Sequence, residues 1–208
     1  MDMRLLLLSP ASTAAQRAGR FPADDPLDAR GLAEVKAHAA RLRAALSGDA
    51  ATFVSPATCA RETASALGLA ATVDAALADI NYGNWQGRRL ADLAIEAPQE
   101  LAAWTLDPYA APPGGESFSQ LVTRMGQWLD ALGTPDETGG GTTNGKTSAA
   151  STRAHTVVAV THAPLLRAAI VYAIGASPTV FPRIEITPLS MVELRYSQRG
   201  WTWRPASL

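Results

Sequence analysis

The chain has 208 residues, of which 47% are hydrophobic and 18% charged, a balance typical of one large folded domain and not of a disordered chain. Its formal net charge of -1 excludes the global positive field that recruits nucleic acid or anionic lipid. A single cysteine excludes an internal disulfide and, with only three histidines, argues against a structural zinc site, so we expect a cytoplasmic protein with no cofactor, no metal, no nucleic-acid partner and no membrane segment.

The first predicted element is a short apolar run, residues 3–8, which contains four consecutive leucines and stops at Ser9 and Pro10. Such a run is typical of a strand that is buried on both faces, as in the centre of a parallel sheet. Pro10 has no N–H and pushes Ser9 toward extended geometry, so the strand should end there. Because ligands of open α/β sheets bind beyond the carboxyl ends of the strands, we expect a site at residues 9–13.

The later elements alternate between helices and strands. Apolar residues at helical spacing predict helices over 32–46, 56–67, 88–95, 99–106, 118–132 and 163–174. Short apolar runs predict strands over 51–55, 70–77, 155–161 and 185–197, with residues 200–203 closing the last one and residues 79–87 forming a surface loop. This alternation favours an α/β fold, a three-layer α/β/α sandwich with a mostly parallel central sheet.

Residues 134–154 are rich in Gly, Ser and Thr and have no apolar period, which predicts a flexible insertion within a single domain that spans residues 1–208. Residues 140–147 inside it match the phosphate-loop pattern G-x-x-x-x-G-K-[ST]. That loop requires a strand before it and a helix after it, and here it stands between loop residues. We therefore interpret the stretch as a solvated linker.

Six stretches in order resemble the histidine phosphatase superfamily, also called the phosphoglycerate mutase-like family. They cover nearly the whole chain outside the insertion, and the stretch from Trp104 to Ser117 is most similar to α-ribazole phosphatases. The matching stretches are residues 5–21, 25–31, 55–64, 79–87, 113–117 and 158–163.

The resemblance implies a mechanism in which a histidine at the end of the first strand attacks phosphorus. Two arginines and a second histidine bind the phosphoryl oxygens, and a carboxylate after the third strand is the general acid. The nucleophile position is Pro10 here, the two arginine positions are Ser9 and Cys59, and the glycine position is Ala11. The acid and the second histidine are matched by Asp79 and His162. Planar guanidinium groups suit phosphate oxygens, so these losses should weaken anion binding as well as chemistry.

Other residues near these positions could contribute. Cys59 has no arginine six residues later and no evident cation to lower its pKa, so we interpret it as inert. Ser9, Ser12 and Ser55 could be nucleophiles only with a base, for which His162 is the candidate, although a locally hydrogen-bonded histidine is the simpler interpretation. The candidates for contact with an anion or other ligand are Thr13, Arg17, Arg20 and Ser55.

Two functions are therefore open at this stage. The first is a degenerate, catalytically impaired member of the family that keeps a cleft for a small phosphorylated or anionic molecule, with Asp79 and His162 as vestigial groups. The second is a phosphatase-like hydrolase, related to α-ribazole phosphatases, with rearranged chemistry that uses His162 and Asp79 with water or a serine. The sequence sets no oligomeric state.

Overall fold

The computed structural model of the protein describes residues 2–46, 49–133 and 156–205. The strands are β1 (Met3–Leu8), β2 (Ala50–Val54), β3 (Thr72–Val73), β4 (Thr156–Val160), β5 (Met191–Ser197) and β6 (Gly200–Arg204). The α-helices are α1 (Ala14–Arg17), α2 (Ala29–Leu46), α3 (Thr58–Ala66), α4 (Leu90–Glu96), α5 (Pro98–Leu106), α6 (Phe118–Gly133) and α7 (Ala163–Ala173). Short 3₁₀ helices cover Ala75–Leu77, Gly83–Trp85 and Pro178–Arg183.

The described strands form one six-stranded sheet in the order β3-β2-β4-β1-β5-β6. The pairs β3–β2, β2–β4 and β4–β1 are parallel, and β5 and β6 add an antiparallel hairpin beside β1. The leucine run thus lies between two neighbours, as predicted, with a parallel strand on one side and an antiparallel one on the other. A mixed, mostly parallel α/β sheet is confirmed.

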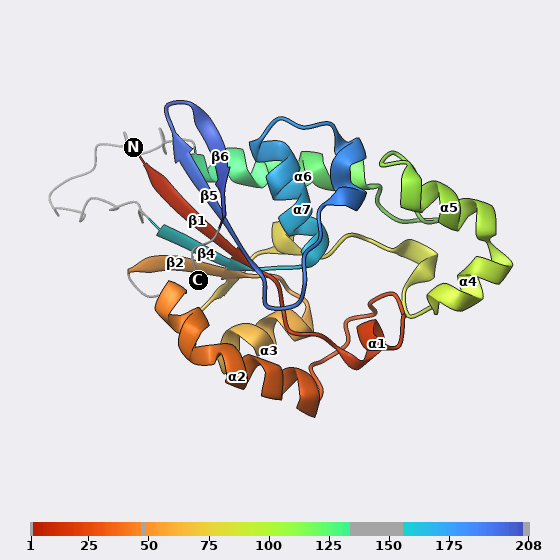
Figure 1. Ribbon diagram of the computed structural model, residues 1–208, viewed down its shortest axis with the longest axis horizontal. Coiled ribbons are helices and arrows are strands. Elements are labelled where there is room, and N and C mark those ends of the chain that lie inside the picture. The colour runs from red at the N-terminus through yellow and green to blue at the C-terminus, as the bar shows by residue number, and fades with distance from the viewer. Residues whose placement is uncertain (1, 47–48, 134–155, 206–208) are drawn as a thin grey trace, which may run out of the picture.

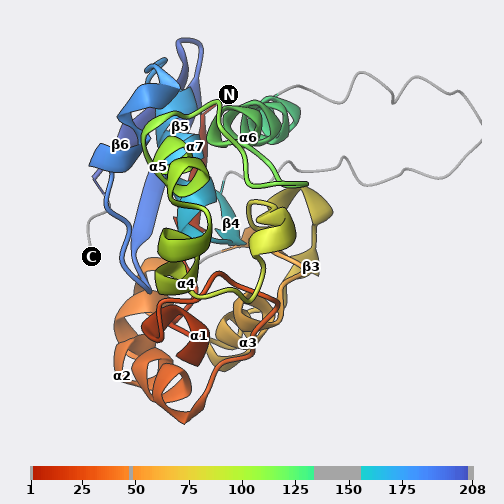
Figure 2. The same ribbon diagram turned by 90° about the vertical axis from the view of Figure 1, so that its right-hand side faces the viewer.

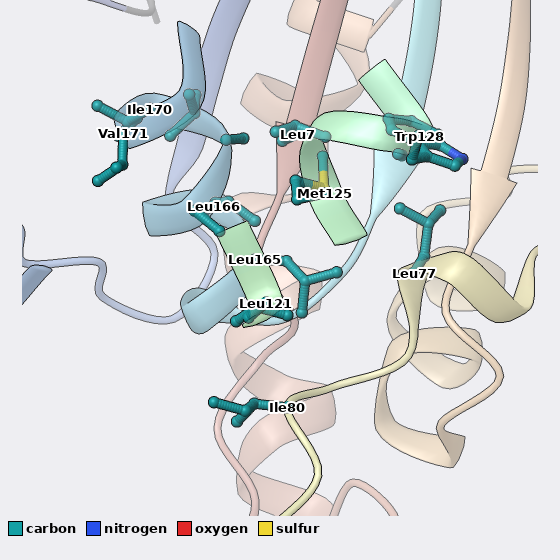
Figure 3. Packing of buried hydrophobic residues seen from close by; sticks show 14 of the residues in the cluster. Leu7, Leu77, Ile80, Leu121, Met125, Trp128, Leu165, Leu166, Ile170 and Val171 are labelled. Carbon is teal, nitrogen blue, oxygen red and sulfur yellow. The ribbon is translucent and has the colours of Figure 1, made fainter. Parts of the chain in front are cut away.

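Helices cover both faces of this sheet, with α2 and α3 on one side and α6 and α7 on the other (Figure 1). Alternate side chains of β1 point to opposite faces of the sheet. Leu5 and Leu7 pack in the core beside α6 and α7, and Leu6 and Leu8 pack in the core beside α2 and α3. Figure 3 shows the first core, with Leu7 beside Met125 of α6 and Leu165 and Leu166 of α7 nearby. All four leucines of the run are at most 1% exposed, which explains why the strand lacks polar alternation.

The helices α4 and α5 lie beyond the sheet, at the end toward which the parallel strands point (Figure 1). Seen from that end, α4, α5 and α1 stand in front of the strand ends (Figure 2). In the described part of the chain, no helix is both long enough and apolar enough to cross a membrane.

Two predicted strands are shorter than the apolar pattern suggested. The prediction of a strand over 70–77 was wrong except at Thr72 and Val73, because the Asp74 side chain accepts a hydrogen bond from the Ala76 N–H and begins a 3₁₀ turn. The prediction for 185–197 was wrong before Met191, because Leu189 has a φ of 58° and the Ser190 N–H bonds to the Thr187 carbonyl in a turn. Residues 200–204, expected to close that strand, form the separate strand β6.

The predicted insertion at 134–154, its phosphate-loop pattern at 140–147 and the first residue of the predicted strand 155–161 lie outside the described residues. The single domain over 1–208 stays a prediction. Ser117 caps the start of α6, because its Oγ accepts from the Gln120 N–H at 3.2 Å and the Gln120 side chain accepts from the Ser117 N–H at 2.8 Å.

The contact between α6 and α7 predicts the effect of Gly126→Ala. A Cβ at Gly126 would lie 2.4 Å from Cε2 of Tyr172, so the ring and the helices must shift. Overpacking by one methyl typically outweighs the gain in helix propensity, and we expect a net loss of about 1–2 kcal/mol in the free energy of unfolding. Urea denaturation measures it. Gln127→Ala on the exposed face of α6 is the control and should change stability by less than about 0.5 kcal/mol; equal stability of both variants would contradict the tight packing.

Candidate active site

The register of the parallel strands brings the predicted site positions together. Leu8, Val160 and Val54 are aligned partners at the carboxyl ends of β1, β4 and β2. The ladder continues for one more step, since the Thr161 N–H donates to the Leu8 carbonyl and the Ser55 N–H donates to the Val160 carbonyl, each at 2.9 Å. Ser9, His162 and Ser55 therefore follow three adjacent strands at one edge of the sheet, as expected for the site of an α/β protein.

A cavity of about 560 Å³ opens at this edge. It is a size typical of sites for small molecules. A second cavity of about 350 Å³ adjoins it and shares Cys59, Asp79 and His162, and Thr13 lines this second cavity only. The residues of the larger cavity that the sequence had singled out are Ser9, Pro10, Ser12, Arg17, Arg20, Cys59, Asp79 and His162.

His162 precedes the first turn of α7 and has hydrogen-bonding or ion-pair contacts at both ring nitrogens. Its Nε2 lies 3.0 Å from the Ser55 Oγ, and its Nδ1 lies 3.3 Å from the Asp79 Oδ2. The Ser55 side chain is fully buried and also accepts from the Ala57 N–H at 3.2 Å. The three residues form a Ser–His–Asp chain in which Ser55 and His162 are buried and Asp79 is half-buried. A serine without access to solvent cannot meet a substrate in this conformation, whatever base it contacts.

Asp79 is held in place by its own loop. Its Oδ1 accepts from the Ile80 N–H at 2.8 Å, and Arg124 of α6 donates to the Asp79 carbonyl and to those of Ala76 and Ala78. Glu116 pairs with Arg124 at 2.8 Å. Burial raises the pKa of the Asp79 carboxyl, and this effect is opposed by His162, by the Ile80 N–H and by Arg124. A raised pKa suits a carboxyl that gives up a proton.

The end of β1 makes its polar contacts with the protein itself. The Ser9 Oγ donates to the Thr187 carbonyl at 2.8 Å and accepts from the Ser190 N–H at 3.0 Å. The Pro10 carbonyl accepts from the Leu189 N–H at 3.3 Å. These bonds fasten the turn at residues 187–190, part of which lines the larger cavity. Ser9 thus has a structural role, which the sequence did not indicate: its hydrogen bonds hold this turn against the end of β1. Ala11 is buried, and its N–H donates to the Thr63 Oγ1.

Cys59 reaches both cavities from the first turn of α3. Burial and the nearby charge of Asp79 raise the pKa of its thiol to about 12. At neutral pH the group is therefore a thiol and not the thiolate that acts as a nucleophile. Among the described residues, no three His, Cys, Asp or Glu side chains are grouped to hold a metal ion.

The predicted ligand-contact residues differ in how free they are to bind. Arg17 donates to the Ser12 carbonyl and Oγ at 3.0 and 2.8 Å and pairs with Asp28, so its charge is largely used within the protein. The Thr13 Oγ caps α1 by accepting from the Gln16 N–H. Ser55 is buried against His162. Arg20 is exposed at the edge of the cavity and stays available to a ligand.

The sequence analysis missed the aromatic and cationic residues that form the rest of the larger cavity. The ring of Phe21 packs 5.1 Å from Tyr82 and 5.4 Å from Trp104, measured between ring centroids. Arg167, five residues after His162 on α7, also lines the cavity. Phe21 and Trp104 both lie in stretches that resemble the family, which was the signal available for them, whereas Arg167 had no signal beyond its spacing from His162.

Comparison with known proteins agrees with this geometry. The sequence model of the histidine phosphatase superfamily (branch 1) matches residues 11–206, so the match begins directly after Ser9 and Pro10. A bifunctional protein of Mycobacterium tuberculosis is 33% identical over 135 residues, which are 62% of this chain and 37% of that protein. The matched stretch thus spans little more than a third of the curated relative.

Solved structures superpose over almost the whole chain. A mycobacterial glucosyl-3-phosphoglycerate phosphatase is 25% identical with a TM-score of 0.79, covering 98% of this chain and 97% of its own. The α-ribazole phosphatase from Shigella flexneri is 22% identical with a TM-score of 0.78, covering 97% of this chain and 95% of its own. The mycobacterial enzyme has also been solved with VO3 and with inorganic phosphate. The family match over residues 11–206, on a phosphoglycerate mutase-like α/β fold, shows that this protein belongs to the histidine phosphatase superfamily.

Proposed function

We propose that this protein is a degenerate histidine phosphatase that binds a small anionic or phosphorylated molecule in its cavity and lacks the phosphohistidine reaction of its family. The observation that carries the proposal is Pro10, which lines the cavity at the end of β1. A proline side chain has no atom that can attack phosphorus. The proposal includes a cytoplasmic location.

The neighbouring groups do not replace the missing nucleophile. Both ring nitrogens of His162 are in contact with Ser55 and Asp79, and a pKa of about 12 keeps Cys59 protonated. Two guanidinium contacts with phosphate are absent at Ser9 and Cys59, a loss of about 3–6 kcal/mol of anion binding at about 1.5–3 kcal/mol each. Turnover of a phosphate monoester would therefore lack both the attacking atom and most of the charge that stabilises its transition state.

Binding is supported by what the cavity keeps. It retains about 560 Å³ of space and the cations Arg20 and Arg167 at its wall. The related mycobacterial phosphatase binds inorganic phosphate and VO3, which supports an anionic group in the ligand of this chain. A site that keeps its volume and some positive charge but loses its nucleophile is suited to binding without turnover.

A second candidate function rests on the Ser55–His162–Asp79 chain. Its order of contacts is that of a hydrolase in which a histidine takes the proton of a serine and a carboxylate orients the ring. The complete burial of Ser55 counts against it. A water molecule activated by His162, with Asp79 as its partner, is the other form of this alternative.

The first prediction is the absence of phosphatase turnover. Wild-type protein incubated with p-nitrophenyl phosphate, α-ribazole phosphate and glucosyl-3-phosphoglycerate should release phosphate no faster than the His162→Ala variant, because neither form has a nucleophile at residue 10. Malachite-green assay of released phosphate measures the rates. Turnover by the wild type that His162→Ala abolishes would contradict the proposal and favour the rearranged hydrolase.

The second prediction concerns Ser55→Ala. Removal of the hydroxyl leaves the Ala57 N–H and the His162 Nε2 without their buried partner, so we expect a loss of about 1–3 kcal/mol in the free energy of unfolding. Chemical denaturation followed by tryptophan fluorescence measures it. Thr52→Ala in β2 is a control, since its Oγ1 makes only a 3.5 Å contact with the Ala50 carbonyl.

The same Ser55→Ala variant distinguishes a structural role, in which Ser55 positions His162, from a catalytic one. If Ser55 only supports His162, hydrolysis of p-nitrophenyl acetate stays at the low wild-type rate. A loss of about 10³-fold or more in a wild-type ester hydrolysis rate would instead identify Ser55 as a nucleophile.

The third prediction is that Ser9→Arg, Pro10→His and Cys59→Arg together restore phosphate binding, by about 1.5–3 kcal/mol for each guanidinium that reaches the anion. Calorimetry with inorganic phosphate measures the gain. The triple variant should lose stability, because the Ser9 hydrogen bonds to Thr187 and Ser190 are removed. The single variant Ser9→Ala measures how much stability these hydrogen bonds contribute. A folded triple variant with no gain in affinity would place the anion elsewhere in the cavity.

A further inference from the structure

Arg167 is a cation of the cavity whose charge the protein does not neutralise. It lies on α7, five residues after His162, and lines the larger cavity. Its Nε is buried and has no hydrogen-bond partner. Among the residues that the structure describes, it forms no ion pair, although the charge of the exposed Glu185 acts on it. A buried donor without a protein partner is rare in native proteins and calls for an explanation, such as a contact with a ligand.

The other charged groups of this cavity are either paired or at its edge. Arg17 is bonded to Ser12 and Asp28. Asp79 contacts His162 and accepts from the Ile80 N–H. Burial raises the pKa of the Tyr82 hydroxyl well above its ordinary value, so the phenol beside Arg167 is neutral. Burial also lowers the pKa of Arg167, which means that desolvation of its charge is not compensated by the surrounding protein.

The wall of the cavity that Arg167 lines is mainly apolar. Phe21, Trp104 and Leu90 line the same cavity, together with Ile186 from the segment before β5. Leu90 is 47% exposed, although it is a large apolar side chain at a cavity wall. A ligand that covered it would remove this apolar surface from water, which favours binding in proportion to the area covered.

We infer that Arg167 binds the anionic group of a ligand whose apolar or aromatic body lies against Phe21, Trp104 and Leu90. The anion site has thus moved from the end of β1, where Ser9 and Pro10 stand, to the first turns of α7. The inference rests on the proposed function, because it names the chemistry of the molecule that the cavity holds. A guanidinium can bind a carboxylate or a phosphate monoester through two parallel hydrogen bonds, and both are compatible with this site.

Three probes with one aromatic body test the inference: 1-naphthoate, 1-naphthyl phosphate and the neutral 1-naphthalenemethanol. Calorimetry should show that the wild type binds at least one anion about tenfold or more tightly than the neutral probe. Arg167→Met keeps the length of the side chain without its charge and should abolish this preference while leaving the affinity for naphthalenemethanol within about twofold. Arg88→Met, which removes an exposed arginine paired with Glu96 outside the cavity lining, is the matched control and should bind like the wild type.

The stability of the variants separates a ligand contact from a structural role. Because Arg167 makes no ion pair, Arg167→Met should melt at the wild-type temperature or above it, and Arg167→Lys should retain part of the anion preference. The inference would be overturned if Arg167→Met kept the full preference for the anionic probes. It would also be overturned if Arg20→Met lost that preference while Arg167→Met kept it. Tighter binding of naphthyl phosphate than of naphthoate assigns a phosphate ligand, and the reverse assigns a carboxylate.

The same probes distinguish failure of the proposed function from failure of the inference about Arg167. Release of naphthol from naphthyl phosphate would overturn the absence of turnover, whereas naphthoate cannot be hydrolysed and still tests Arg167. Equal binding of all three probes would keep the cavity as a binding site and overturn the role of Arg167. Binding of none of them would overturn both proposals.

Discussion

The ladder that aligns the ends of β1, β4 and β2 is the constraint on which the site depends. Leu8, Val160 and Val54 stand level in it, so the residues that follow must emerge side by side, whatever their chemistry. The apolar character of β1 secures this alignment, because its leucines pack into both helical layers and a one-residue slip would exchange the two faces. The backbone pairing therefore fixes where these residues emerge, whereas the side chains of Ser9 and Ser55 add contacts of their own to the neighbouring turn and to His162.

Most polar groups at this edge are satisfied by the protein. Ser9 holds the turn at residues 187–190, and Ser55, His162 and Asp79 hold one another. Buried polar groups need such partners, because an unpaired one loses the hydrogen bonds of water without replacement. A site that binds a polar ligand leaves hydrogen-bond donors without protein partners, whereas most donors at this edge already have such partners. These groups thus form a network that stabilises this edge of the sheet.

Hydrophobic pattern was sufficient to predict the layers of the fold, and the strand-end rule together with the family resemblance was sufficient to place Ser9, Cys59, Asp79 and His162 at one cavity. Pattern failed where a single polar or strained residue decides the backbone, as at Asp74, which begins a 3₁₀ turn, and Leu189, whose φ is positive. Directions of side chains could not be predicted either. The Ser9 bond to Thr187 and the Ser55 bond to His162 join residues 178 and 107 positions apart, and only the packed structure fixes them.

The free energies of charged and apolar contacts determine what kind of molecule such a cavity can bind. Under the proposed function, two guanidinium contacts of about 1.5–3 kcal/mol each are missing from the anion site, so we expect a bare phosphate ion to bind weakly. Apolar contact contributes about 2.5 kcal/mol for each 100 Å² removed from water, which is similar to one such contact. The end of β1 carries the uncharged residues Ser9 and Pro10, and Phe21, Trp104 and Leu90 line the wall of the same cavity. We therefore expect the affinity for the proposed ligand to come mainly from its apolar body, with Arg167 selecting the charge that this body carries.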